Sequence, residues 1–272
     1  MVEDQILNEI LAAAPAFLLI AVRAFAMIQV APLLNSDAIP QVAKFALAGF
    51  VAYASFDTAI VSTWVIAPFG LNFAFLVIGE AFIGIIIGFF LSIIFAAFVT
   101  AGQFFSLQMG FGASETFDPL SQIENPLLGQ YLNLVAMLVF VTIGGFSLLL
   151  DGFSRSLQSI SVMSLIHGRE HIVTMMLAGL SRLFFNAIVI ALPILGTLFL
   201  VSLTTGLISK ASPQINILSE GFPISIMVAF LVIYTALPFM TETFGRIIGS
   251  GFENLQTLYI RIGERIVEGG GT

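Results

Sequence analysis

Residues 71–99 read LNFAFLVIGEAFIGIIIGFFLSIIFAAFV, a run in which Glu80 is the one charged residue. A run this long and apolar predicts an α-helix, because a strand of a membrane barrel needs only about 9–11 residues. As a straight helix it would extend about 43 Å, whereas the hydrocarbon core of a bilayer is about 30 Å thick. The helix must therefore tilt, bend or leave the bilayer.

Five further apolar runs accompany it, and the six together predict an all-α, multi-helix membrane protein. The other five are Ile10 to Leu34, Phe45 to Ile66, Leu127 to Leu150, Leu183 to Ile208 and Phe222 to Met240. Polar or helix-breaking residues interrupt several runs, namely Arg23, Glu80, Asn186, Pro15, Pro193 and Pro238. Because an ionisable group is costly in hydrocarbon unless it faces protein or water, we expect tilted, broken helices that form hairpins.

The composition excludes most soluble enzymes, since 58% of the residues are apolar and 9% are charged, against about 25% charged in a soluble domain. Sixteen acidic and nine basic residues give a net charge of −7, so there is no basic footprint for nucleic acid. The absence of cysteine excludes disulfides and cysteine-ligated metals. Tyr and Trp are scarce beside 28 Phe, which indicates that much of the surface meets protein instead of a lipid interface.

Basic residues outside the apolar runs predict the orientation in the membrane. They cluster after the fourth run and after the sixth, at Arg155, Arg169, Arg182, Arg246, Arg261 and Arg265. The positive-inside rule therefore places residues 151–182 and the C-terminus in the cytoplasm.

Two connections carry apolar residues at helical spacing. In residues 151–182 these are Leu157, Ile160, Met163 and Ile166, which predict amphipathic helices. In residues 241–272 a stripe of apolar residues predicts a C-terminal amphipathic helix, and its members are Ile248, Phe252, Leu255, Tyr259, Ile262 and Ile266. The stripe fits a self-packing or interfacial helix and a docking site for a partner helix equally well.

Few motifs point to chemistry. Gly84 and Gly88 form a G-x-x-x-G pattern, which lets helix backbones pack closely. His167 to His171 spell H-x-x-E-H, an inverted zinc-protease pattern, but Gly168 weakens the helix that the motif requires. A polar junction between helices explains this pentapeptide better than a zinc site does. We therefore expect no catalytic residue, metal site or cofactor.

The connection formed by residues 101–126 is the most unusual stretch. It has three acidic residues, no basic residue, and large apolar side chains beside glycines. The apolar side chains are Phe104, Phe105, Met109, Phe111 and Phe117. The stretch fits a re-entrant loop that is buried for packing, or a movable apolar plug, because a hydrophobic constriction can close a pore by dewetting.

Several short stretches in order resemble the FliR family of flagellar export-gate proteins and, more distantly, its counterparts in virulence type III secretion. Near the start they are RAF at 23–25, followed by Pro32, and IPQV at 39–42. The loop contributes MGFG at 109–112 and FDP at 117–119, followed by NPLLG at 125–129 and LN at 132–133. The last are ASPQINI at 211–217 and GFP at 221–223, in which Pro213, Gln214 and Asn216 are the partner-contact candidates.

The resemblance implies a hetero-oligomeric, spiral export gate in the bacterial inner membrane, within the flagellar basal body. One FliR-like chain would join several FliP-like and FliQ-like subunits, and an FlhB-like protein would dock at the cytoplasmic side. The cargo would be unfolded rod, hook and filament subunits. Arg23, Glu80, Gly84, Gly88 and the C-terminal stripe would pack within this assembly. The plug loop would comprise Met109, Gly110, Phe111, Gly112, Phe117, Asp118 and Pro119.

The sequence thus predicts one non-enzymatic domain over residues 1–272. Its parts are hydrophobic helices over 1–100, a plug loop over 101–126, helical hairpins over 127–240 and an amphipathic helix over 241–272. Met109, Phe111 and Phe117 would fill the closed pore, Gly110 and Gly112 would act as its hinge, and Pro119 and Pro126 would stiffen its far end. A virulence export-gate subunit and a six-helix secondary transporter are the alternatives.

Overall fold

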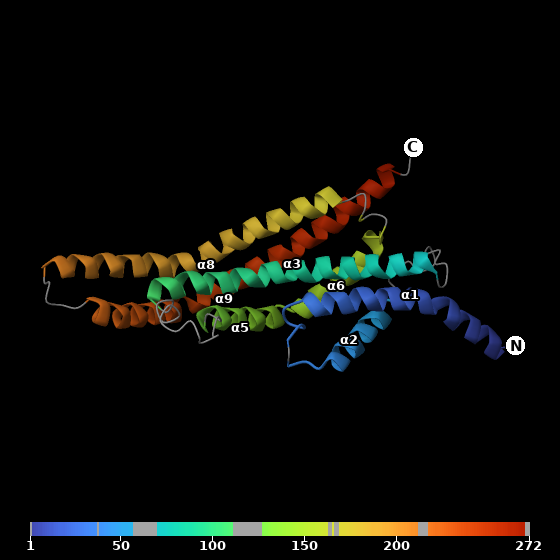
Figure 1. Cartoon of the computed structure of the whole chain (residues 1–272), viewed down its shortest axis with the longest axis horizontal. Helices are drawn as coiled ribbons and strands as arrows, with labels where there is room; N and C mark the ends of the chain where they lie inside the picture. Colours follow the sequence, from blue (N-terminus) through green and yellow to red (C-terminus); the bar gives the residue numbers. More distant parts are fainter. Residues whose placement is uncertain are drawn as a thin grey trace. The chain divides into compact units, whose positions relative to one another are not determined.

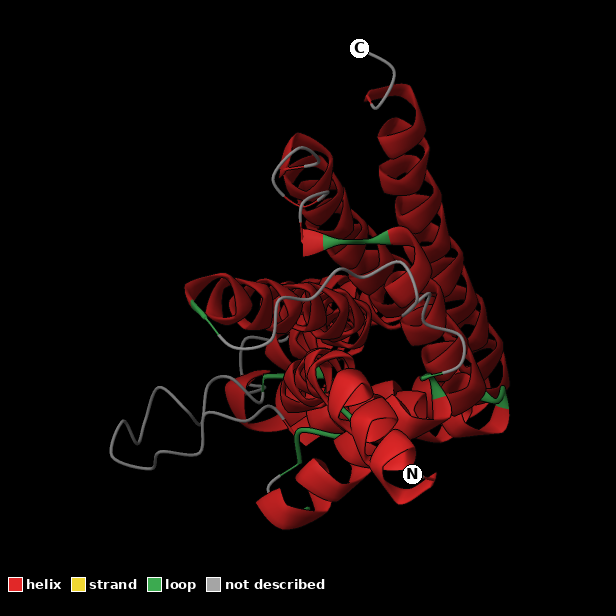
Figure 2. Cartoon of the chain, turned by 90° about the vertical axis from the view of Figure 1, so that its right-hand side faces the viewer, coloured by secondary structure: helices red, strands yellow, loops and turns green. Residues whose placement is uncertain are grey.

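The computed structural model of the chain describes residues 2–36, 38–56, 70–110, 127–162, 165, 169–211 and 217–269. Within these ranges it describes the side chains of residues 13–211, 221 and 223–259. Its regular elements are helices, and no strand occurs in these ranges (Figure 2). In chain order they are α1 (Val2–Val30), α2 (Gln41–Ala54), α3 (Leu71–Met109), α5 (Leu127–Thr142), α6 (Gly145–Ser159), α8 (Arg169–Ala211) and α9 (Ile217–Gly269), labelled in Figure 1. The predicted all-α class is confirmed.

The chain divides into two compact units. Unit 1 contains residues Met1–Ile93, Gly144–Gly179 and Ser250–Thr272, and unit 2 contains Ile94–Ile143 and Leu180–Gly249. The long helices α3, α8 and α9 each contribute one part to each unit. Each unit is therefore assembled from segments that are far apart in the sequence.

In unit 1, α2 packs against α1, and the two helices lie side by side in Figure 1. The rings of Phe25 and Phe45 stack with centroids 4.2 Å apart, and the side-chain amide of Gln29 donates to that of Gln41 over 2.8 Å. The α2 face toward the core consists of Lys44, Ala48, Val51 and Ala52. Small apolar residues on this face let the two helices approach closely.

In unit 2, aromatic rings fill much of the space between helices. The ring of Phe95 on α3 meets that of Phe140 on α5 edge to face, with centroids 5.8 Å apart. The ring of Phe98 lies 4.5 Å from that of Phe244 on α9. At Gly102 the α3 backbone meets α5 directly, because a Cβ there would collide with the backbone of Gly129.

The described residues account for four or five of the six spans that hydropathy predicts. Four stretches in the described residues are long and apolar enough to cross a bilayer: Ala13–Val30, Leu71–Met109, Arg169–Ala211 and Pro223–Tyr259. The consecutive helices α5 and α6 would supply a fifth if they form one span. From the second predicted run only the 14-residue α2 is described, since residues 57–69 lie outside the described ranges.

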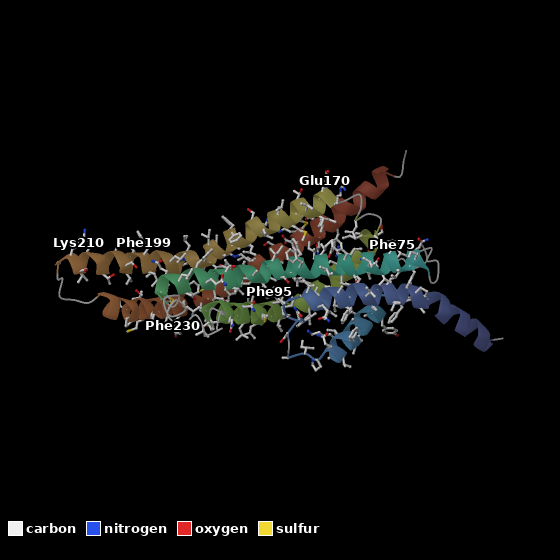
Figure 3. All side chains as sticks on the ribbon, viewed as in Figure 1. Phe75, Phe95, Glu170, Phe199, Lys210 and Phe230 are labelled. Atoms are coloured by element: carbon white, nitrogen blue, oxygen red, sulfur yellow. The ribbon has the colours of Figure 1, made fainter. Side chains whose placement is uncertain are left out.

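The helix ends also differ from the predicted limits. The third run extends to Met109, so that α3 has 39 residues. The fourth run breaks at Gly144, whose φ of 74° is a left-handed conformation that glycine adopts without a steric cost. The fifth run lies inside the 43-residue α8, with Glu170 and Lys210 near its two ends (Figure 3). The sixth run and the amphipathic tail form one helix, the 53-residue α9.

Candidate functional site

A buried arginine organises the core of unit 1. Arg23 lies two turns before the end of α1, and none of its surface is exposed. Its Nε donates to Oε2 of Glu80 on α3 over 2.5 Å, and the Glu80 side chain is 4% exposed. The two charges that interrupt apolar runs therefore neutralise each other inside the protein, away from lipid.

The remaining guanidinium donors of Arg23 bind the C-terminal end of α6. Nη1 donates to the carbonyl oxygen of Ser156 over 2.7 Å and to its hydroxyl over 3.2 Å. Nη2 donates to the carbonyl oxygen of Ile160 over 3.0 Å. The carbonyl oxygens in the last turn of a helix carry partial negative charge, so a buried cation stabilises this end. Arg23 thus joins α1, α3 and α6.

Two glycines on α3 set the distance between α3 and α1. A Cβ on Gly84 would collide with the carbonyl oxygen of Arg23, and one on Gly88 would lie 2.8 Å from that of Met27. The hydroxyl of Ser92, one turn later, donates to the carbonyl oxygen of Val30 over 2.8 Å. Since Glu80 is one turn before Gly84, this close approach holds its carboxylate against Arg23.

The C-terminal stripe begins with Ile248 in unit 2, and its next three members pack inside unit 1. Phe252, Leu255 and Tyr259 are 5%, 2% and 2% exposed. A Cβ at Gly152 of α6 would lie 3.8 Å from Cδ2 of Leu255, so the stripe passes beside α6. The side chain of Ile262 lies outside the described residues. In this state the predicted stripe serves self-packing, and its use for a partner stays a prediction.

The structure describes only the beginning of the predicted plug loop. Met109 ends α3 with no exposed surface, and Gly110 follows with a φ of 89°. A glycine in this conformation is a common helix terminator, because it turns the chain away without a clash of a Cβ atom. The other plug residues lie outside the described ranges, namely Phe111, Gly112, Phe117, Asp118 and Pro119.

Two further predicted sites fall partly or wholly outside the described residues. Pro213, Gln214 and Asn216 belong to the connection between α8 and α9, which is not described. Of the H-x-x-E-H motif, Glu170 and His171 begin α8, whereas His167 lies outside. Among the residues that the structure describes, no three His, Asp or Glu side chains gather as metal ligands would.

Sequence reasoning missed the contributions of the α6 terminus and of Gly102. Ser156 and Ile160 act mainly through backbone oxygens, which any residue carries, and the Ser156 hydroxyl adds a longer hydrogen bond, so the residue types gave little signal. Ile160 was identified only as part of an apolar helix face. Gly102 and Gly129 could have been identified as a close helix contact from their lack of side chains.

Comparison with known proteins identifies the chain. Residues 14–251 match the family described as "Bacterial export proteins, family 1". The chain belongs to this family. Its membership and its four or five apolar helices make it a multi-pass protein of the bacterial inner membrane. The match covers both units, including the Arg23 cluster and most of α9.

The relatives of this bacterial export protein include flagellar and virulence proteins. A flagellar biosynthetic protein FliR of Bacillus subtilis is 28% identical over 263 residues, 94% of this chain and 99% of that protein. A FliR of Borreliella burgdorferi is 32% identical over 201 residues, 73% of this chain and 74% of that protein. The surface presentation of antigens protein SpaR of Shigella sonnei is 28% identical over 160 residues, 59% of this chain and 61% of that protein. The predicted resemblance to this family is confirmed.

Proposed function

We propose that this chain is a structural, non-enzymatic subunit of the flagellar type III export gate, through which unfolded rod, hook and filament subunits cross the inner membrane. The observation that carries the proposal is the near full-length similarity to a FliR protein. The similarity to SpaR covers less of the chain, which favours the flagellar role over the virulence role. The Arg23 cluster supports a structural role, because each of its groups is occupied in holding helices together.

The partners in this proposal are FliP-like and FliQ-like gate subunits and an FlhB-like protein. Large apolar side chains on α8 and α9 support the existence of protein neighbours. For example, Phe185 and Leu207 on α8 and Met227 and Tyr234 on α9 are between 66% and 80% exposed. Such surfaces must be covered by lipid or by other subunits.

Native mass spectrometry of the tagged protein, co-expressed with the neighbouring genes of its chromosome, tests the assignment. We expect complexes that contain one copy of this chain and several copies of two smaller membrane proteins. A stable monomer or homodimer without such partners would contradict the export-gate assignment and favour a self-contained transporter. Deletion of the chromosomal copy then separates the two type III roles, because loss of motility supports the flagellar role.

The proposed plug comprises Met109 and Gly110 at the end of α3 and the connection that follows them. In this proposal the side chains of Met109, Phe111 and Phe117 close the pore. Gly110 and Gly112 act as the hinge on which the plug moves. Pro119, which follows Asp118, and Pro126 stiffen the far end of the plug. Met109, the last residue of α3, is buried, which supports the packing of the first residue of the plug against protein. A dry constriction of this kind blocks ions without any charged group.

Replacement of residues 111–119 by a Gly-Ser linker of equal length tests the plug while it retains Met109 and the end of α3. We expect increased leakage of small ions through the assembled gate. A matched control replaces residues 120–124, which lie in the same connection and lack aromatic side chains. Unchanged leakage in a correctly assembled complex would contradict the plug assignment.

A further inference from the structure

Lys44 is a buried cation of unit 1 without a counter-charge among the described residues. It lies at the end of the first turn of α2, and 2% of its surface is exposed. Arg23, which is buried in the same unit, has Glu80 and two carbonyl oxygens as partners. Lys44 has neither an ion pair nor a hydrogen bond to any residue that the structure describes. Since a buried charge without a partner is strongly unfavourable, this lysine requires an anion from outside these residues.

The start of α2 beside this lysine is also free to receive an anion. The first N–H groups of a helix have no acceptor within the helix. Pro40 precedes α2, no side chain caps this end, and no acidic residue occupies the first turn. The side chain of a helical lysine extends over the preceding turn, toward the N-terminus. The Lys44 ammonium and the partial positive charge of the helix end therefore attract an anion to the same region.

Helix α2 runs back along α1, so that the two form an antiparallel hairpin. Near the start of α2, the ring of Phe45 stacks on that of Phe25. Just after the end of α2, the ring of Phe56 lies 6.4 Å from that of Phe17, two turns earlier on α1. The whole length of α2 therefore lies beside the apolar part of α1.

This arrangement places the start of α2 at the level of lipid headgroups. The stretch of α1 that could cross a bilayer ends at Val30, and the exposed polar residues Asn35 and Ser36 follow it. When this stretch crosses the membrane, the connection from α1 to α2 lies at the interface, where the phosphates of lipids are found. The rest of α2 then lies beside hydrocarbon.

The outer face of α2 is suited to acyl chains. The side chains of Val42, Phe45, Phe50 and Tyr53 are between 60% and 78% exposed. Between residues 45 and 54 the Tyr53 hydroxyl is the only polar side-chain group. A carboxylate of another protein chain would find few polar groups on this face to orient its surroundings, whereas acyl chains need none. The apolar face next to an unpaired cation therefore favours a lipid as the source of the anion.

We propose that Lys44 and the start of α2 bind the phosphate of an anionic phospholipid, whose acyl chains pack along Phe45, Phe50 and Tyr53. The phosphate oxygens accept hydrogen bonds from the Lys44 ammonium and from the first N–H groups of α2. A lipid with a net negative charge neutralises the lysine. A zwitterionic lipid binds more weakly, because the first turn of α2 has no acidic residue for its cationic group.

Native mass spectrometry and thermal unfolding of the delipidated full-length protein in a nonionic detergent test the lipid site. The probes are dioleoyl phosphatidylglycerol and dioleoyl phosphatidylcholine, which differ only in the headgroup. We expect phosphatidylglycerol to bind about tenfold tighter or more, the factor that a hydrogen bond to a charged group contributes. Phe50→Ser should weaken both lipids alike, since it removes a contact with the acyl chains. Equal affinities of the two lipids for the unmodified protein would contradict the proposal.

The variant Lys44→Met separates the headgroup site from general stability. Without lipid it should raise the unfolding temperature, because it removes an unpaired buried charge. It should also abolish the preference for phosphatidylglycerol. Lys210→Met is the matched control, because Lys210 is exposed in the last turn of α8, and it should retain the preference. The lipid site is wrong if Lys44→Met retains the preference or if Lys210→Met loses it to the same extent.

Two other sources of the anion would give different results. If inorganic phosphate stabilises the protein as much as phosphatidylglycerol does, the acyl chains play no part and the ligand is a free anion. Asp37, three residues before Pro40, lies outside the described residues. If its carboxylate is the partner of Lys44, Asp37→Asn will lower the unfolding temperature without lipid, and the unmodified protein will show no preference between the lipids. We expect Asp37→Asn to leave the preference for phosphatidylglycerol in place.

Discussion

At the scale of single residues, Arg23 has the largest structural role. A buried guanidinium is tolerated only when its charge is neutralised and its donors are used, since an unpaired charge in the interior is strongly destabilising. Here Glu80 supplies the charge, and the oxygens of Ser156 and Ile160 accept the other hydrogen bonds. The side chain therefore determines where three helices meet.

Removal of either member of the buried pair of Arg23 and Glu80 should destabilise the protein. We expect Arg23→Met or Glu80→Gln to cost about 3–5 kcal/mol of stability, because each leaves a buried group without its partner. The measurement is thermal unfolding of the purified protein in detergent. The double variant Arg23→Met with Glu80→Met should recover part of the loss, since no unpaired charge remains.

The exposed pair of Asp151 and Arg155 provides a matched control. Their side chains are 47% and 56% exposed, and the N–O distance is 2.8 Å. Asp151→Asn should change stability by about 0.5 kcal/mol or less, because water screens an exposed pair. Equal losses for Glu80→Gln and Asp151→Asn would contradict the role given to the buried pair.

The sequence identified Arg23 and Glu80 as residues that must face protein or water, because the cost of charge in hydrocarbon can be read from the sequence. It could not pair them. The two residues are 57 positions apart, and the α6 oxygens lie more than 130 positions after Arg23. Such pairing depends on tertiary packing, and contacts between residues so far apart cannot be predicted from a single sequence.

At the scale of helices, glycines determine how closely α1 and α3 pack. We expect Gly84→Ala to destabilise the protein by about 1–3 kcal/mol, because the new methyl group meets the backbone of α1, which cannot rotate away. Gly88→Ala should have a similar but smaller effect. The measurement is again thermal unfolding, with recovery of the monodisperse protein after extraction as a second readout.

Two other glycines serve as matched controls. Gly196 and Gly206 lie inside α8, and a Cβ at either would have no atom within 4 Å. Gly196→Ala and Gly206→Ala should therefore be neutral or stabilise by up to about 1 kcal/mol, since alanine favours the helix. If these variants destabilise as much as Gly84→Ala, close packing is not the reason for the glycine at position 84.

The existence of the helices could be predicted from hydropathy, but several of their limits could not. The sequence predicts the last apolar run and the amphipathic helix over 241–272 as separate parts, whereas they form one helix, α9, that continues to Gly269. A change from apolar to charged side chains alters the surroundings of a helix without breaking its backbone hydrogen bonds. Gly144 acts in the opposite way, because it breaks the helix within an apolar run.

At the scale of the whole molecule, the long helices differ in how much of their apolar surface the chain covers. In the apolar stretch of α3 that could cross a bilayer, 61% of the residues are buried inside the protein. The corresponding shares are 28% in α8 and 17% in α9. Helix α3, whose long apolar run predicts the fold, is therefore also the most buried of these three helices. The apolar surfaces of α8 and α9 face lipid or other subunits.

The length of α8 leads to a prediction about its orientation. Its 43 residues extend about 65 Å, about twice the thickness of the hydrocarbon core, so its ends must lie in water or protein. Arg182 and Lys210 enclose its uncharged stretch. We expect cysteine at position 170 to react with a membrane-impermeant maleimide from the cytoplasm and cysteine at position 210 from the opposite side, as the basic residues indicate.

Cysteine at position 199, in the middle of the uncharged stretch, is the internal control for this labelling and should not react from either side. Reaction of positions 170 and 210 from the same side would mean that α8 does not cross the membrane. The positive-inside assignment would then have to be revised for this chain. The absence of native cysteine makes single-site labelling possible without prior substitutions.

The contact between Arg23 and the end of α6 also has a consequence for biosynthesis. Ser156 is translated 133 residues after Arg23, a delay on the order of ten seconds at bacterial elongation rates. During this interval the arginine can pair with Glu80 but has no access to the α6 oxygens, so α1 cannot complete its burial while it leaves the ribosome. The nascent chain must keep this helix in a hydrated or assisted environment until α6 has been made, and unit 1 closes only then.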